Sequence, residues 1–255
     1  MNATKFAKGA IFPIAALIVW EAAMRIGNVQ SDSLAAPSQI AAAFYQALID
    51  GTIPRRTGET LRTALTGLAL GGGAAVIVSV ILGLVPAAAR LMQFSIEVLR
   101  PVPAVALIPV AIMTLGFGYG MGIALVAFAC FWPVLIYGHS AIVNIEPQLL
   151  DVSRVLRLGA FGRVTKIVLP AALPRYFVAF RLSAAVALII SVTVEIAANP
   201  LGIGHELMTA SQSLHPDLMF AMLLWLGLVG WAVNAVLLFA QRRLFGPAAY
   251  SASLQ

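Results

Sequence analysis

Long apolar segments separated by short polar ones make up this chain, and this pattern restricts it to a membrane-embedded fold. Of the 255 residues, 61% are hydrophobic and only 10% are charged, which is typical of a membrane protein and not of a soluble domain. About 20 consecutive apolar residues are enough to cross a bilayer as a helix. We predict six spans, at residues 9–27, 61–86, 101–115, 121–143, 176–198 and 218–240.

The predicted fold class is therefore an all-α membrane protein with about six transmembrane helices in a single domain, residues 1–255. Residues 1–60 would hold the first span and an extracytoplasmic segment, and residues 61–243 the core. Basic residues flank the spans at both ends of the chain, and basic residues favour the cytoplasmic side. We expect a multi-pass protein of the cytoplasmic membrane with both termini in the cytoplasm; the basic residues are Lys5, Lys8, Arg242 and Arg243.

Several other classes of protein are disfavoured by the residues present. The net charge of +6 follows membrane topology, so we expect no nucleic-acid partner. Cys130 is the single cysteine and cannot form an internal disulfide. We see no metal-ligand spacing, no Walker motif and no catalytic constellation, so we expect neither an enzyme nor a metal site. Gly67 and Gly71 have the spacing that lets two helices approach closely.

Prolines interrupt the third predicted span. Pro103 and Pro109 predict a break in the helix over residues 101–115. A broken helix at membrane depth is tolerated where protein or an aqueous cavity satisfies the backbone, which favours a place beside the translocation pathway. A proline-kinked packing helix is an equal alternative.

Two charged residues fall inside the fifth predicted span. Glu195, near its outer end, is a candidate for the pathway because a charge inside the membrane is costly and usually functional. Arg181, near its inner end, is a second candidate, although its side chain can also snorkel to the interface. After Glu195, Gly202 and Gly204 predict a tight outer loop that would form part of a gate.

The longest polar interruption is the segment of residues 146–174. Its first part, after Pro147, predicts a short amphipathic helix ending near Leu158. Pro170 and Pro174 are expected to break the chain before the fifth span. The polar face of the helix holds Asp151, Ser153, Arg154 and Arg157. One interpretation is a surface helix in the headgroup region. The other is a docking element that places its face in a partner's groove. Periodicity alone does not separate the two.

This segment resembles the EAA loop of binding-protein-dependent ABC importers, whose pattern is Glu-Ala-Ala, three residues, Gly, nine residues, Ile, one residue, Leu-Pro. The resemblance implies a cytoplasmic coupling loop that contacts an ATPase, with Arg157 at the usual glycine and Gly159 as a substitute for the turn. The matching or neighbouring residues are Asp151, Val152 and Ser153 at Glu-Ala-Ala, then Arg154, Arg157, Gly159, Ile167, Leu169 and Pro170.

The resemblance extends over most of residues 34–243, including LAAPSQI, LRTALTGLALGGG, RPVPAVALIPV and VEIAANPLGIG. These stretches are similar to permeases of the nitrate, sulfonate, taurine and bicarbonate importers, with a bundle like that of type I ABC importers. The resemblance implies a pathway for a small anionic or heterocyclic solute. It also implies a second permease copy, which would make a homodimer, and an extracytoplasmic binding protein. ATPase subunits would bind ATP and Mg²⁺, and this chain would hold no cofactor.

A different class of transporter is the alternative. A secondary carrier would couple solute movement to a proton taken up by Glu195. Inverted repeats and paired broken helices are typical of such carriers, and the sequence shows no such symmetry.

Overall fold

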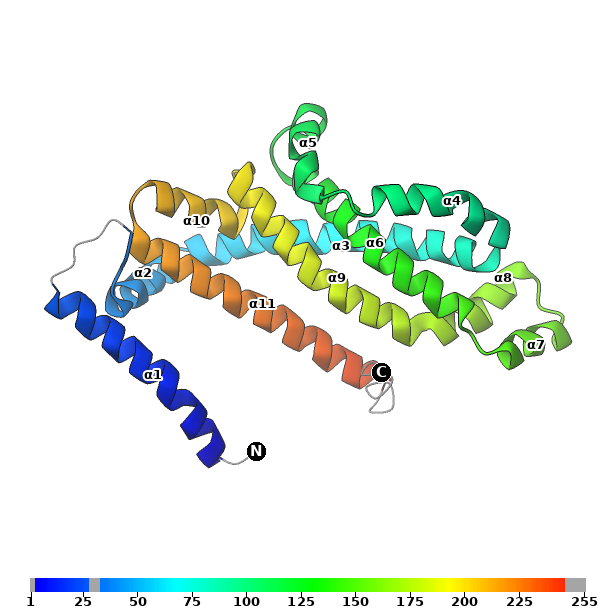
Figure 1. The fold of residues 1–255 in the computed structure, drawn as a ribbon, viewed down its shortest axis with the longest axis horizontal. Helices are drawn as coiled ribbons and strands as arrows, with labels where there is room; N and C mark the ends of the chain where they lie inside the picture. The colour runs from blue at the N-terminus through cyan, green and yellow to red at the C-terminus, as the bar shows by residue number, and fades with distance from the viewer. Residues whose placement is uncertain (1–2, 28–32, 246–255) are drawn as a thin grey trace.

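The computed structural model describes residues 3–27 and 33–245, and the elements in that part are helices (Figure 1). The side chains of residues 3–11 and of Leu150, Val152, Arg154 and Phe245 lie outside the description. The helices are α1 Ala3–Ile26, α2 Pro37–Ile49, α3 Thr52–Leu84, α4 Pro86–Leu99, the 3₁₀ helix η1 Ala104–Leu107, α5 Ile108–Leu115, α6 Tyr119–Val143, α7 Pro147–Val155, α8 Ala160–Arg163, the π-helix η2 Val164–Val168, α9 Leu169–Ala197, α10 Gly202–Gln212 and α11 Pro216–Phe245.

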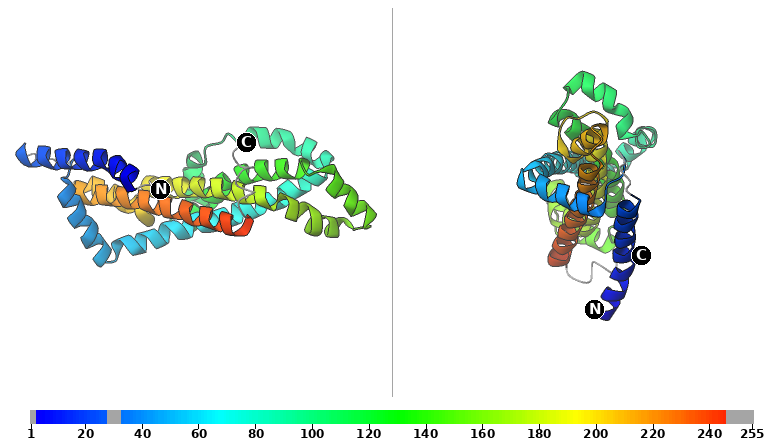
Figure 2. Two further views of the ribbon diagram at one scale, coloured as in Figure 1. Left: turned by 90° about the horizontal axis from the view of Figure 1, so that it is seen from below. Right: turned by 90° about the vertical axis from the view of Figure 1, so that its left-hand side faces the viewer.

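Helices α3, α6 and α9 pack together at the centre of an elongated bundle (Figures 1 and 2). The predicted close approach at Gly67 and Gly71 is confirmed. A Cβ atom added to Gly67 would lie 2.6 Å from the Cβ atom of Val126, and one added to Gly71 would overlap the carbonyl group of Ala127. Small residues therefore set the distance between α3 and α6.

The predicted fold class, an all-α membrane protein with about six spans, is confirmed. Four helical segments of the described part are long and apolar enough to cross a membrane, and a fifth candidate is the bent pair of residues 86–99 and 104–115. The predicted first span, residues 9–27, falls largely within α1, whose side chains up to residue 11 lie outside the description.

The third predicted span is wrong in its bounds. Helix α5 has only eight residues, or about 12 Å of helix, which is too short to cross a bilayer. Helix α4 runs back along the bundle, with Ala88, Ala89 and Ile96 packed on the central core (Figure 1). The two helices meet at an 82° bend.

The fifth predicted span begins too late. We expected Pro170 and Pro174 to break the chain, but α8, η2 and α9 follow one another without a break, and Pro174 lies inside α9. Pro170 is in the first turn of α9 and has no N–H group to donate to the Lys166 carbonyl. The wider π turn that precedes it, in which the Leu169 N–H bonds to the Val164 carbonyl, accommodates this loss.

The bundle has two distinct ends (Figure 1). Helices α7 and α8 lie at one end, here called the α7 end. Helices α2 and α10 lie at the other, here called the α10 end. Helix α2 begins at Pro37, and its buried residues Ile40 and Ala43 pack with Ala221 of α11.

Candidate functional site

A buried hydrogen-bonded cluster at the α10 end surrounds Glu195. This side chain is only 2% exposed, and it lies in the last turns of α9. Its carboxylate accepts hydrogen bonds from the Thr60 hydroxyl at 2.9 Å, the Ser191 hydroxyl at 3.0 Å and the Gly204 backbone N–H at 3.0 Å. We call Glu195, Thr60, Ser191 and the first turn of α10 the Glu195 cluster.

The cluster caps the N-terminus of α10. The first N–H groups of a helix have no partner within it, and they attract negative charge. Here the Gly202 N–H donates to the Glu59 carboxylate at 2.8 Å, and the Ile203 N–H donates to the Thr60 hydroxyl at 2.9 Å. With the Gly204 bond to Glu195, three successive orphan donors are satisfied by α3 and α9.

The loop expected after Glu195 is shorter than predicted, because Gly202 and Gly204 already belong to α10. Gly202 has a φ of +89°, and a Cβ atom there would overlap the Glu195 carboxylate. A Cβ atom on Gly204 would lie 2.5 Å from the Val192 carbonyl oxygen. Both glycines are needed so that the start of α10 can approach the end of α9.

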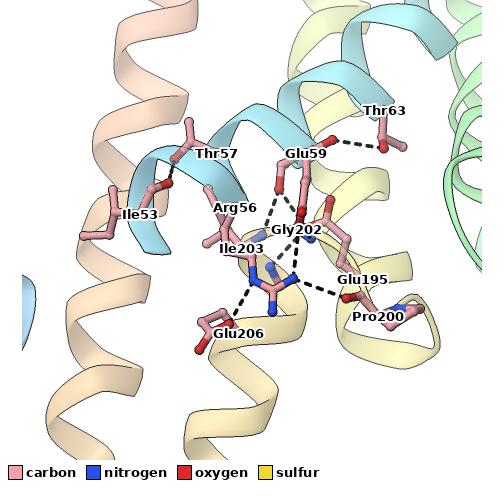
Figure 3. A network of polar contacts seen from close by, with 12 residues as sticks. Ile53, Arg56, Thr57, Glu59, Thr63, Glu195, Pro200, Gly202, Ile203 and Glu206 are labelled. Atoms are coloured by element: carbon pink, nitrogen blue, oxygen red, sulfur yellow. Dashed lines mark hydrogen bonds and ion pairs between the residues drawn. The ribbon is translucent and has the colours of Figure 1, made fainter. Parts of the chain in front are cut away.

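Arg56 ties the cluster to the surface of the α10 end. Its guanidinium group donates to the carboxylates of Glu206 at 2.9 Å and Glu59 at 3.1 Å, and to the Pro200 carbonyl at 3.3 Å (Figure 3). These contacts join α3 to the turn before α10 and to α10 itself. Sequence analysis missed Arg56, Glu59, Thr60 and Glu206 as site residues. The i,i+3 spacing of Arg56 and Glu59 was the available signal, but it did not identify Glu206.

The other predicted pathway residues are not part of this cluster. Pro103 precedes η1 and Pro109 lies in the first turn of α5, so both are at the bend between α4 and α5. Arg181 is half-buried on α9, and its guanidinium group lies 3.4 Å from both the Asn234 and the Gln241 side-chain oxygens of α11. The structure thus places the tentative pathway residues in three separate regions.

At the opposite end, the last residue of α7 and the residue after it turn apolar side chains outward. Val155 is 82% exposed and Leu156 is 61% exposed, whereas Ser153, on the predicted polar face, is only 2% exposed. Asp151 is exposed as well, and the side chains of Val152 and Arg154 lie outside the description. The end of the helix therefore leaves apolar surface uncovered.

The turn after α7 is made by Arg157 and not, as expected, by Gly159. Arg157 has a φ of +49°, in the left-handed region that glycine adopts most readily. The Leu158 N–H bonds to the Ser153 carbonyl at 3.1 Å, which is the long-range bond of a Schellman helix end. Gly159 has an ordinary φ of −64°. The position that is glycine in the EAA pattern thus keeps the glycine conformation, at a cost of about 1 kcal/mol.

The last three predicted coupling residues lie where the α7 end joins the bundle. Ile167 is in the π turn, Leu169 begins α9, and Pro170 follows it. Val168, between them, is fully buried in the central core. A displacement of α8 would therefore act directly on α9.

No group of three or more His, Cys, Asp or Glu side chains within residues 12–27 and 33–244 is arranged to hold a metal ion. These observations define the class: a multi-pass membrane protein with one end closed by hydrogen bonds and an uncovered amphipathic helix at the other. The model of the family described as "Binding-protein-dependent transport system inner membrane component" matches residues 67–245, and the chain belongs to this family.

Individual relatives agree with this family. One, from Bacillus subtilis (strain 168), carries the name aliphatic sulfonates transport permease protein SsuC. It is 27% identical over 237 residues, which is 93% of this chain and 86% of the relative. The nitrate import permease protein NrtB of Synechocystis is 25% identical, over 88% of this chain and 84% of the relative.

A solved structure shares the fold. It shows inward-facing conformations of the MetNI methionine ABC transporter, and a chain of it has a TM-score of 0.54 and 17% identity. The match covers 80% of this chain and 98% of that one. At this identity the likeness supports the fold alone.

Proposed function

We propose that this chain is the permease subunit of an ATP-driven ABC importer and forms the pathway for a small anionic or heterocyclic solute, such as a sulfonate, taurine or nitrate. Family membership and the names of the relatives support transport. The observation that carries the ATP-driven part is the end of α7, where Val155 and the following Leu156 are exposed and offer an apolar docking surface beyond the bundle.

In this proposal the α7 end faces the cytoplasm and binds the ATPase subunits, which hold ATP and Mg²⁺. This chain would supply no catalytic site and no cofactor. A binding protein would approach the α10 end, and a second copy of the chain would complete the pathway in the bilayer. The coupling residues are Asp151, Val152, Ser153, Arg154, Arg157, Gly159, Ile167, Leu169 and Pro170.

The unbroken helical path from α8 to α9 offers a mechanical link between the two ends. Helix α9 alone has 29 residues, or about 44 Å, and it carries Glu195 at its far end. Movement of α7 and α8 by the ATPases would shift α9 as a rigid rod and so change the population of inward-open and outward-open states.

The proton-coupled carrier is not favoured. Glu195, which such a carrier would use, is enclosed and accepts three hydrogen bonds from the groups that it caps. Its burial therefore has a structural explanation, and a proton-transfer role is not needed to account for it.

The proposal is tested by coexpressing the chain with an ATPase subunit and reconstituting the complex in proteoliposomes. Replacing residues 151–159 by a flexible linker should abolish copurification of the ATPase and binding-protein-stimulated ATP hydrolysis, because it removes the docking helix. Asp151→Lys should abolish coupling while the protein still folds. Asp217→Lys, an acidic residue at the α10 end, is the matched control. Normal uptake by the Asp151→Lys variant, or transport by the chain alone down a proton gradient, would refute the proposal.

A further inference from the structure

A cavity of about 380 Å³ lies where the end of α4 meets the middle of α6 and α9. Its walls are mainly apolar and aromatic, with Phe128 and Ile136 from α6 and Val186 and Ile190 from α9. This volume is in the range of sites that hold small organic ligands. None of its lining residues belongs to the Glu195 cluster.

Arg100 is the single charged residue among the described residues that line the cavity. It directly follows α4, whose 14 residues extend about 21 Å back from the α7 end, level with the middle of α6 (Figure 1). A charged side chain at such depth is costly and marks a solute pathway or a partner. Arg100 has no ion pair in the part of the chain that the structure describes.

Trp132 lines the cavity with its indole ring. The ring is held at right angles to two neighbours, with centroids 5.7 Å from Phe128 and 5.1 Å from Phe131. Its Nε1 atom is buried and is not exposed to the cavity, so the ring adds an apolar wall while Arg100 supplies the charged group.

We propose that this cavity is a solute site for a small organic monoanion with an apolar part, such as an alkanesulfonate, and that Arg100 binds its anionic oxygens. This inference rests on the proposed import function. The guanidinium group suits a multi-oxygen anion because it can donate two parallel hydrogen bonds.

The same features disfavour an inorganic anion such as nitrate. A small hydrophilic ion would contact Arg100 but would leave the aromatic and aliphatic walls without a partner. An apolar tail would cover Phe128, Val186 and Ile190, and its transfer from water raises the affinity about fourfold per CH₂ group. The cavity therefore distinguishes between the two kinds of anion named by the relatives.

The test is direct binding, measured calorimetrically on the permease–ATPase complex without a binding protein. Ethanesulfonate, butanesulfonate and nitrate are the probes. We expect the affinity to rise from ethanesulfonate to butanesulfonate and nitrate to bind most weakly. Arg100→Gln should weaken butanesulfonate binding about tenfold or more, because a charge-assisted hydrogen bond is lost.

A matched control excludes general effects. Arg90→Gln changes an arginine of α4 that lies outside the cavity, and it should not alter binding. Equal affinity of the Arg100→Gln variant and the unchanged protein, or nitrate binding as tight as butanesulfonate, would overturn the inference. If the ATPase subunit does not copurify with the unchanged chain, by contrast, that result would count against the proposed function itself.

An anionic lipid offers the same chemistry from another source. The titration is therefore repeated in nanodiscs of phosphatidylcholine alone and with added phosphatidylglycerol. Similar butanesulfonate affinity in both supports a solute site. If phosphatidylglycerol abolishes binding and copurifies with the unchanged protein but not with the Arg100→Gln variant, the cavity is a lipid site and the inference is wrong.

Discussion

The two ends of the bundle differ in how their helix termini are held. At the α10 end, Glu195, Thr60 and Glu59 accept the first three N–H groups of α10. At the α7 end, Val155 is 82% exposed and Arg157 has a φ of +49°. The start of α10 is thus fixed by side chains of α3 and α9, whereas α7 ends in exposed apolar surface that, in the proposed function, a partner covers.

The largest effect is expected from Gly202→Ala. Its Cβ atom would overlap the Glu195 carboxylate, and its φ of +89° is unfavourable for alanine. Together these should destabilise the protein by about 3 kcal/mol, seen as a lower midpoint of thermal unfolding in detergent. Gly227→Ala is the control, because nothing lies within 4 Å of its Cβ position. Equal midpoints for both variants would show that the cluster is not tightly packed.

Glu195→Gln should cost less, about 2 kcal/mol. The amide can still accept hydrogen bonds from Thr60 and Gly204, but it loses the negative charge that favours the start of α10. Thermal unfolding and amide hydrogen exchange of residues 202–206 measure this change. Unaltered protection there would mean that α10 does not depend on the Glu195 charge.

Val155→Asp probes the α7 end. Because Val155 is exposed, the variant should fold with unchanged stability, but its affinity for the ATPase should fall about tenfold, or about 1.4 kcal/mol. Pull-down titration with the ATPase is the measurement. Ile49→Asp, at an exposed residue of the α10 end, should leave this affinity unaltered. A similar loss of affinity in both variants would show that α7 is not part of the docking surface.

The smallest effect is expected from Arg157→Gly. Glycine adopts the left-handed turn without strain, so the free energy of unfolding should rise by about 1 kcal/mol. Gly159→Ala should change it by less than about 0.5 kcal/mol, because Gly159 has φ −64° and open space around its Cβ position. Chemical denaturation in mixed micelles compares the two variants. A larger loss of unfolding free energy for Gly159→Ala would show that Gly159, and not Arg157, makes the turn.

Sequence patterns predicted the fold class and most helices because hydrophobicity and helix signals are local. The spans at residues 121–143 and 218–240 fall within α6 and α11, and Gly67 and Gly71 make the predicted close contact. Prediction failed where prolines were treated as simple breaks. Pro174 lies inside a helix and Pro170 follows a π turn. Each proline removes a backbone hydrogen bond, but the burial of Val168, Ala172 and Tyr176 in the central core holds this part of the helix.

The sequence by itself determined that this chain is a helical membrane protein with a loop spaced like a coupling loop, since length, apolar content and spacing are properties of the chain alone. Only the tertiary structure decided what Glu195 does and which residue turns the chain after α7. Thr60 is 135 residues from Glu195, and no local pattern specifies which distant donors meet. The left-handed conformation of Arg157 likewise depends on how α7 and α8 are held by the bundle.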